Sequence, residues 1–174
     1  MNAGDEPESA AANARAILEA LARHHVDYLL IGGFAVNAHG YPRLTRDVDI
    51  LVRPDEDNTA CLARAIADLD PDWRLPGNRD PQDVDRVDWW FGDFARFRTP
   101  EGSLDTHRRL EGVRADYQEL DSRAITAEIT DLRVRVIGYD DLIRIKRATG
   151  RPQDLADIAA LEDARRPPER SQSF

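Results

Sequence analysis

One stretch decides the fold of this chain: Asp47-Val48-Asp49-Ile50-Leu51-Val52. Apolar residues alternate in it with the two aspartates, which is the period-two pattern of a β-strand. Side chains two positions apart on a strand point the same way and lie about 7 Å apart, so Asp47 and Asp49 share one face. We predict a strand over residues 47–52 that carries a pair of carboxylates.

The acidic pair is a candidate metal site. Two carboxylates on one face repel each other, and a hard divalent cation such as Mg²⁺ or Mn²⁺ removes that cost by taking oxygen ligands from both. Asp47 and Asp49 are therefore candidate metal ligands. The alternative is an exposed edge of the sheet, where two solvated aspartates cost little. An Asp-x-Asp pair alone does not decide between them.

Upstream of the acids, a short apolar strand over residues 28–31 stops at Gly32-Gly33, where a brief helix over 34–39 begins. Glycines at a strand-to-helix turn let backbone N–H groups approach an anion, which the helix dipole favours. A phosphate would fit there, although a plain tight turn is the alternative. Between the glycines and the acids, Arg43 and Thr45 offer a guanidinium and a hydroxyl to the same place.

Downstream, a hairpin is predicted from strands over 94–98 and 103–107, because the intervening Thr99-Pro100-Glu101-Gly102 has the residue types of a turn. This hairpin places Asp105 near the centre of the sheet. A third carboxylate that converges on Asp47 and Asp49 would complete a two-metal site of the kind that aligns an attacking hydroxyl and a leaving pyrophosphate. An outward-facing strand residue is the alternative.

The remaining pattern predicts an α/β (α+β) fold, a mixed twisted sheet with flanking helices, mostly on one side, and two C-terminal helices. Further elements are a helix over 9–24 with Ser9 as N-cap, a helix from Pro54-Asp55 to before Pro71, a loop over 70–84, a strand at Trp89-Trp90-Phe91, a hairpin over 125–129 and 132–137, and helices over 139–149 and from 152. We predict a single domain over residues 1–164 and a disordered tail over 165–174.

Composition narrows the class of protein. The 174 residues carry 24 basic and 33 acidic side chains, and the net charge of −9 disfavours non-specific binding to nucleic acid. No apolar run approaches the roughly 20 residues of a membrane-spanning helix, and the acidic N-terminus lacks the order of a secretion signal. The single Cys61 cannot form an internal disulfide, so we expect a cytoplasmic protein.

Two stretches together resemble a known signature. The segment 31–35, Ile-Gly-Gly-Phe-Ala, followed by Arg-Leu-Thr-Arg-Asp-Val-Asp-Ile over 43–50, is similar to that of the polymerase-β-like nucleotidyltransferases. Within that superfamily the chain most resembles the small bacterial AbiEii-type toxins and related minimal nucleotidyltransferases. Their late motif, a Lys followed by an Arg and a Lys/Arg/Gln-Asp-x-x-Asp pattern, is similar to Lys146, Arg151 and the stretch 153–157. The likeness covers about residues 26 to 162.

The resemblance implies a role for each matching residue. Asp47 and Asp49 would bind the metal, Asp105 would be the third carboxylate and the base that activates the acceptor, and Lys146 would contact the triphosphate. The turn at residues 32–33 would hold the phosphates, beside Arg43 and Thr45. One departure is that many members have Gly-Ser at the turn, so the hydroxyl that would touch a phosphate is absent at Gly33. Asp154 and Asp157 keep two interpretations, a site role or simple capping of a helix.

The function expected from this resemblance is transfer of a nucleoside monophosphate from an NTP to a hydroxyl acceptor, with release of pyrophosphate. The acceptor stays open between tRNA, for a toxin with an antitoxin protein as partner, a small hydroxylated antibiotic, and a protein hydroxyl. The alternatives from other classes are a catalytically inactive nucleotide-binding or protein-interaction module and a metal-dependent nuclease. Ser103, Asp105 and His107 alternate on one strand and cannot form a hydrolase triad, which needs contacts near 3 Å.

Overall fold

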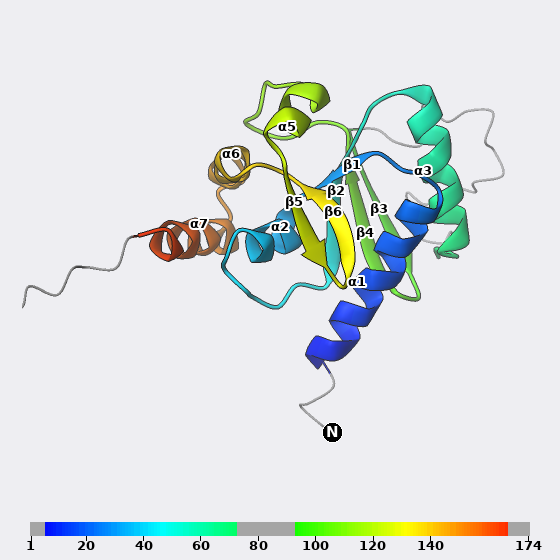
Figure 1. The fold of residues 1–174 in the computed structure, drawn as a ribbon, viewed down its shortest axis with the longest axis horizontal. Helices are drawn as coiled ribbons and strands as arrows, with labels where there is room; N and C mark the ends of the chain where they lie inside the picture. Colours follow the sequence, from blue (N-terminus) through cyan, green and yellow to red (C-terminus); the bar gives the residue numbers. More distant parts are fainter. Residues whose placement is uncertain (1–5, 73–92, 167–174) are drawn as a thin grey trace, which may run out of the picture.

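The computed structural model describes residues 6–72 and 93–166, which form a six-stranded mixed sheet covered by helices (Figure 1). The strand order across the sheet is β3-β4-β2-β1-β6-β5. The strands are β1 (Tyr28–Leu30), β2 (Asp47–Val52), β3 (Phe94–Thr99), β4 (Gly102–His107), β5 (Ile125–Ile129) and β6 (Leu132–Val136). The helices are α1 (Glu6–Arg23), α2 (Gly32–Ala38), α3 (Glu56–Asp68), α5 (Tyr117–Arg123), α6 (Tyr139–Thr149) and α7 (Pro152–Ala164).

The central strands are joined by both kinds of pairing. β1 runs antiparallel to β2 and parallel to β6, and β2 runs parallel to β4. Two hairpins, β3–β4 and β5–β6, form the outer parts of the sheet. The mixed sheet and both hairpins are as the sequence predicted. The strand with the acidic pair thus lies near the middle of the sheet, next to the strand that carries Asp105.

Helices cover both faces of the sheet, whereas the sequence pattern led us to expect them mostly on one side. Figure 1 shows α1 and α3 on one face, and α2 on the other with α6 and α7 beyond it. The residues of β2 explain this arrangement, because Ile50 on one face is fully buried and Leu51 on the other is 3% exposed. A strand that is apolar on both faces needs a cover on each.

The local signals that end the elements act as expected. Thr130 and Asp131 both have positive φ angles, of 50° and 65°, which is how a two-residue turn joins β5 to β6. The Asp55 side chain accepts a hydrogen bond from the backbone of Asn58 and caps α3. Gly150, in the left-handed region with a φ of 60°, ends α6.

Two helices differ from the expectation. α1 begins at Glu6, so Ser9 lies inside the helix and is not its N-cap. α5 was not predicted, although Asp116 and Glu119 form a capping box at its start. The strand expected at Trp89-Trp90-Phe91, most of the loop over 70–84 and the tail from 167 lie outside the described residues. Among the helices of the described ranges, none has the length and apolar character needed to cross a membrane.

Candidate functional site

The three acids singled out in the sequence meet on two neighbouring strands. The register of β2 and β4 places Asp49 directly beside Asp105, and Asp47 beside Ser103. The three acids differ in their exposure to solvent. Asp47 is exposed, Asp49 is half-buried and Asp105 is only 3% exposed. The predicted grouping of the carboxylates therefore exists in the fold, at a place with one side open to solvent.

The surroundings of Asp49 shift the pKa of its carboxyl group. Its pKa is raised from 3.8 to about 6, first because burial disfavours the charged form, and then because Asp105 and Asp47 repel it. The positive charges of Arg151 and Arg96 act in the opposite direction. A carboxylate held beside two others, away from water, is a group whose charge a cation would stabilise.

Asp105 has a partner that we did not predict. Arg96 of β3 lies opposite it in the β3–β4 hairpin and binds both carboxylate oxygens, from Nε at 2.7 Å and from Nη2 at 2.6 Å. This paired contact raises the pKa of Arg96. Over residues 6–72 and 93–166, no group of three or more His, Cys, Asp or Glu side chains is arranged to hold a metal ion. Asp105 is bound by Arg96, whereas Asp47 and Asp49 remain as the pair of acids on β2.

Gly32 lets the strand-to-helix turn lie against the acids. A Cβ atom at this position would come within 2.6 Å of Cγ of Asp49, and the φ of +63° is one that other residues rarely adopt. Only glycine fits both the backbone conformation and the space. The turn also starts α2, whose N-cap Ile31 makes no side-chain capping hydrogen bond. The backbone N–H groups of the first turn therefore receive no hydrogen bond from a capping side chain.

Gly33 faces Thr45. A Cβ at Gly33 would lie 2.7 Å from the Cβ of Thr45 and closer still to its hydroxyl oxygen. The Thr45 hydroxyl thus occupies the space into which a serine at position 33 would project. A hydroxyl is therefore present at the turn although residue 33 is a glycine, and it comes from residue 45 of the adjoining loop.

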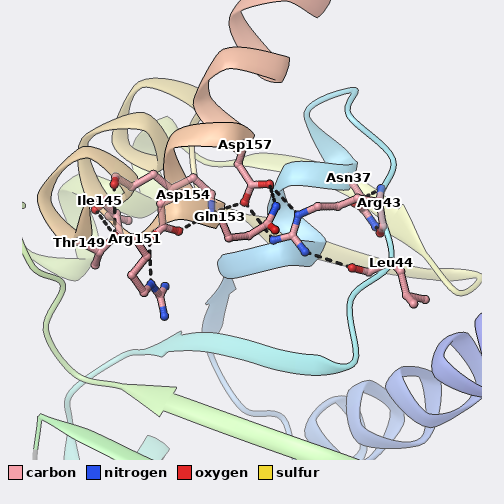
Figure 2. A network of polar contacts seen from close by, with 10 residues as sticks. Asn37, Arg43, Leu44, Ile145, Thr149, Arg151, Gln153, Asp154 and Asp157 are labelled. Carbon is pink, nitrogen blue, oxygen red and sulfur yellow. Dashed lines mark hydrogen bonds and ion pairs between the residues drawn. The ribbon is translucent and has the colours of Figure 1, made fainter.

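Arg43 lies on the other side of the same turn. Its Nη1 is 3.3 Å from the position of a Cβ at Gly33. Asn37 of α2 fixes the arginine backbone through two hydrogen bonds, of 2.9 and 3.0 Å. The guanidinium binds both carboxylate oxygens of Asp157 in α7, at 2.7 and 3.0 Å (Figure 2). Arg43 therefore joins the glycine turn to the C-terminal helices.

Lys146 lies within the C-terminal helices and is 4% exposed. Its Nζ donates to Asp157 at 2.7 Å and to Asp154 at 3.1 Å. These contacts place its charge between α6 and α7. Arg151, at the N-cap of α7, is instead 73% exposed and binds Asp154 through Nε at 2.7 Å.

Solved structures match the chain over most of its length. The lincosamide antibiotic adenylyltransferase LnuA, with lincomycin bound, is 18% identical with a TM-score of 0.62, and the match covers 87% of this chain and 96% of LnuA. The antibiotic-resistance factor ANT(2'')-Ia is 14% identical with a TM-score of 0.62, over 91% and 85%. A Thermotoga maritima protein described as a nucleotidyltransferase is 15% identical with a TM-score of 0.52, over 87% and 91%. The chain has the nucleotidyltransferase fold.

No protein-family model and no curated protein matches the sequence, so the nucleotidyltransferase fold is established by structure alone. Within that fold the acids of β2 and β4 and the turn at Gly32 and Gly33 occupy one place, although they come from separate parts of the chain. The arrangement joins carboxylates suited to a divalent cation with backbone donors suited to a phosphate.

Two arginines at this place were not among the predicted site residues. Arg96 could have been found by counting back from the turn of the β3–β4 hairpin, which pairs it with Asp105. Arg151 was part of the motif that resembles the nucleotidyltransferases, but its sequence position says nothing about which way it points. Burial raises the pKa of Asp49, and the positive charge of Arg151 is among the charges that oppose this rise.

Proposed function

We propose that the protein is a metal-dependent nucleotidyltransferase, which moves a nucleoside monophosphate from an NTP to a hydroxyl acceptor and releases pyrophosphate. The observation that carries the proposal is the contact between Gly32 and Asp49 in a nucleotidyltransferase fold. It brings a turn with backbone donors against a carboxylate that is itself paired in register with Asp105. A triphosphate and its counter-ion would need both features at one place.

Asp47 and Asp49 would hold the metal, as Mg²⁺ or Mn²⁺. The donor set fits a hard cation, because it consists of carboxylate oxygens on one face of β2. The raised pKa of Asp49 fits as well, since a cation would remove the repulsion from its neighbours. When bound, the cation would neutralise charge on the phosphates and align the reacting groups.

The other residues would bind and orient the substrate. Gly32 and Gly33 would present backbone N–H groups to the phosphates, with the Thr45 hydroxyl and Arg43 beside them. The acceptor oxygen attacks the α-phosphorus, the bond from this phosphorus to the bridging oxygen of the β-phosphate breaks, and pyrophosphate leaves. Asp105 would accept the proton of the acceptor hydroxyl. Arg96 would hold the Asp105 carboxylate in place.

For the acceptor, we favour a small hydroxylated molecule of the antibiotic type over RNA. Two structural neighbours support it, because LnuA is a lincosamide antibiotic adenylyltransferase and ANT(2'')-Ia is an antibiotic-resistance factor. The net charge of −9 also disfavours a polyanionic acceptor. The alternative is modification of tRNA by a cytoplasmic toxin that an antitoxin protein restrains, which the resemblance of the sequence to AbiEii-type toxins supports.

Labelled NTPs test the proposal. The protein is incubated with each α-³²P-labelled NTP and Mg²⁺, and with either hydroxylated antibiotics or total tRNA, while pyrophosphate release is followed. Labelled antibiotic or labelled tRNA identifies the acceptor class. Asp49→Ala is expected to abolish transfer while the fold persists, and Asp163→Ala, at an exposed aspartate of α7, serves as the matched control.

Three results would contradict the proposal. Transfer retained in Asp49→Ala would exclude the metal role of this carboxylate. Metal-dependent NTP binding with no labelled product would indicate a nucleotide-binding module that has lost the reaction. Nicked nucleic acid without pyrophosphate release would indicate a nuclease that uses the same carboxylates on water.

A further inference from the structure

A buried lysine connects two arginines near the glycine turn and Asp49. Lys146 of α6 donates to Asp154 and Asp157 of α7, and each of these acids binds one arginine in turn. Asp154 holds Arg151 through Nε at 2.7 Å, and both oxygens of Asp157 contact one edge of Arg43, formed by Nε and Nη2. Figure 2 shows the acids and arginines of these two branches around the start of α7.

The buried part of this network is unusual for a solvated helix pair. Asp157 is fully buried, while Asp154 and Lys146 are 3% and 4% exposed. Burial raises the pKa of Asp154, but hydrogen bonds from Arg151, Thr149 and Lys146 more than offset it and bring the pKa down to about 2. Thr149 donates to Asp154 at 2.8 Å, and Gln153 donates to Asp157 at 2.9 Å. Both acids are therefore fixed from several sides.

Arg151 is the exposed end of one branch. Its side chain is 73% exposed, and Figure 2 shows its guanidinium projecting away from α6 and α7. Its Nε is used by Asp154, while neither terminal nitrogen has a hydrogen-bond partner among the residues that the structure describes. The ion pair between Arg43 and Asp157 places the start of α7 beside the glycine turn, against which Asp49 lies. Burial raises the pKa of Asp49, and the charge of Arg151 opposes that rise, which agrees with this placement.

We propose that Arg151 is the cation that binds the phosphates of the nucleotide beside Asp49, and that Lys146 is a positioning residue. This inference rests on the proposed function. Lys146 fixes Asp154 and Asp157, which hold Arg151 at the start of α7 and Arg43 beside Gly33. The ligand class is an inorganic or nucleoside polyphosphate. This assignment replaces the contact between Lys146 and the triphosphate that the sequence resemblance implies.

The geometry favours Arg151 over Lys146 for a physical reason. A phosphate contact by Lys146 would require its ammonium to leave two buried carboxylates, and each of them would then keep only its arginine as a counter-charge. Arg151 needs no such exchange, because its terminal nitrogens can donate to phosphate oxygens while Nε stays bound to Asp154. The existing contact would even orient the guanidinium for that purpose.

The first test measures binding of inorganic tripolyphosphate and of AMP, each with Mg²⁺, by calorimetry. Arg151→Gln is expected to weaken tripolyphosphate binding by about tenfold or more, as loss of a charged hydrogen-bond donor would, with AMP binding changed much less. The matched control is Arg147→Gln, because Arg147 is also exposed and pairs across α6 and α7 with Glu162 at 2.9 Å. Arg147→Gln should keep the melting temperature of the wild type, and Arg151→Gln should lower it only slightly because Lys146 and Thr149 still bind Asp154. Unchanged tripolyphosphate binding in Arg151→Gln would overturn the inference.

The second test addresses Lys146 through Asp154, since removing a buried lysine can unfold the chain. Asp154→Asn keeps the size of the side chain and removes the charge that holds Arg151. We expect weaker tripolyphosphate binding in this variant, and no further loss when it is combined with Arg151→Gln. If Lys146 bound the phosphates itself, Asp154→Asn would release it and binding would stay or strengthen, which would refute the positioning role.

The two proposals fail in different ways. Tripolyphosphate binding that depends on Arg151, in a protein that transfers no NMP to any acceptor, would contradict the proposed function and support this inference. Transfer activity that survives in Arg151→Gln, with unchanged triphosphate binding, would contradict this inference alone.

Discussion

Replacing Asp49 with asparagine is expected to stabilise the protein in a buffer that contains a chelator. The folded chain raises the pKa of this carboxyl from 3.8 to about 6, through burial and through the charges of Asp105 and Asp47. A shift of about two units corresponds to about 3 kcal/mol of folding free energy lost at neutral pH. The asparagine is buried too, so we expect a net gain of about 1–2 kcal/mol, or about 2–8 °C in melting temperature for a chain of this length.

The pH dependence of this effect has a definite sign. Because the folded pKa of Asp49 is higher than the unfolded one, its cost is absent below the unfolded value of 3.8 and develops as the pH rises through about 6. The advantage of Asp49→Asn should therefore be complete at pH 7.5 and nearly absent at pH 4. Urea denaturation in EDTA at both values measures it, with Asp163→Asn, at an exposed position of α7, as the control.

Adding Mg²⁺ should reverse the order of the two proteins. The wild type would gain stability as the metal concentration rises, and Asp49→Asn would gain much less because it lacks one carboxylate ligand. An asparagine variant that is no more stable than the wild type at pH 7.5 in EDTA would refute the reasoning. So would an equal advantage at pH 4, because it could not come from the charge of Asp49.

Three further predictions concern the surroundings of the acids and the unpredicted helix. Arg96→Met should lower the free energy of unfolding by about 1–3 kcal/mol in urea denaturation, because Asp105 is left buried without its counter-charge while the arginine itself is part-exposed. Gly33→Ser should cost about 1–3 kcal/mol through overlap with Thr45, and a double-mutant cycle with Thr45→Gly should recover most of that cost. Asp116→Ala should cost about 1 kcal/mol in thermal denaturation by removing the capping box of α5.

The strands of the site could be predicted because their signals are local. The alternation around Asp47 and Asp49 gave the bounds of β2, and the turn at Pro100 gave the register of the hairpin. That register pairs Thr99 with Gly102 and so places Arg96 opposite Asp105. The ion pair was thus available from counting alone.

The network around Lys146 could not be predicted in the same way. Its members come from the loop before β2, from α6 and from α7, and the contact between Arg43 and Asp157 spans 114 positions in sequence. Helical spacing shows which residues share a face of one helix, but it does not give the angle at which two helices cross. Whether Lys146 faces solvent, phosphate or another helix depends on that angle.

The charges around Asp49 indicate why metal and nucleotide should bind together. Three carboxylates, those of Asp47, Asp49 and Asp105, face the guanidinium groups of Arg96 and Arg151, which leaves one negative charge in excess at full ionisation. A triphosphate alone would meet this excess and the repulsion that comes with it. A divalent cation turns the excess into a net positive charge, so each ligand makes the site more favourable for the other. This coupling would follow from the placement of the acids and would weaken if Asp49 were neutral, because the cation would lose a charged ligand.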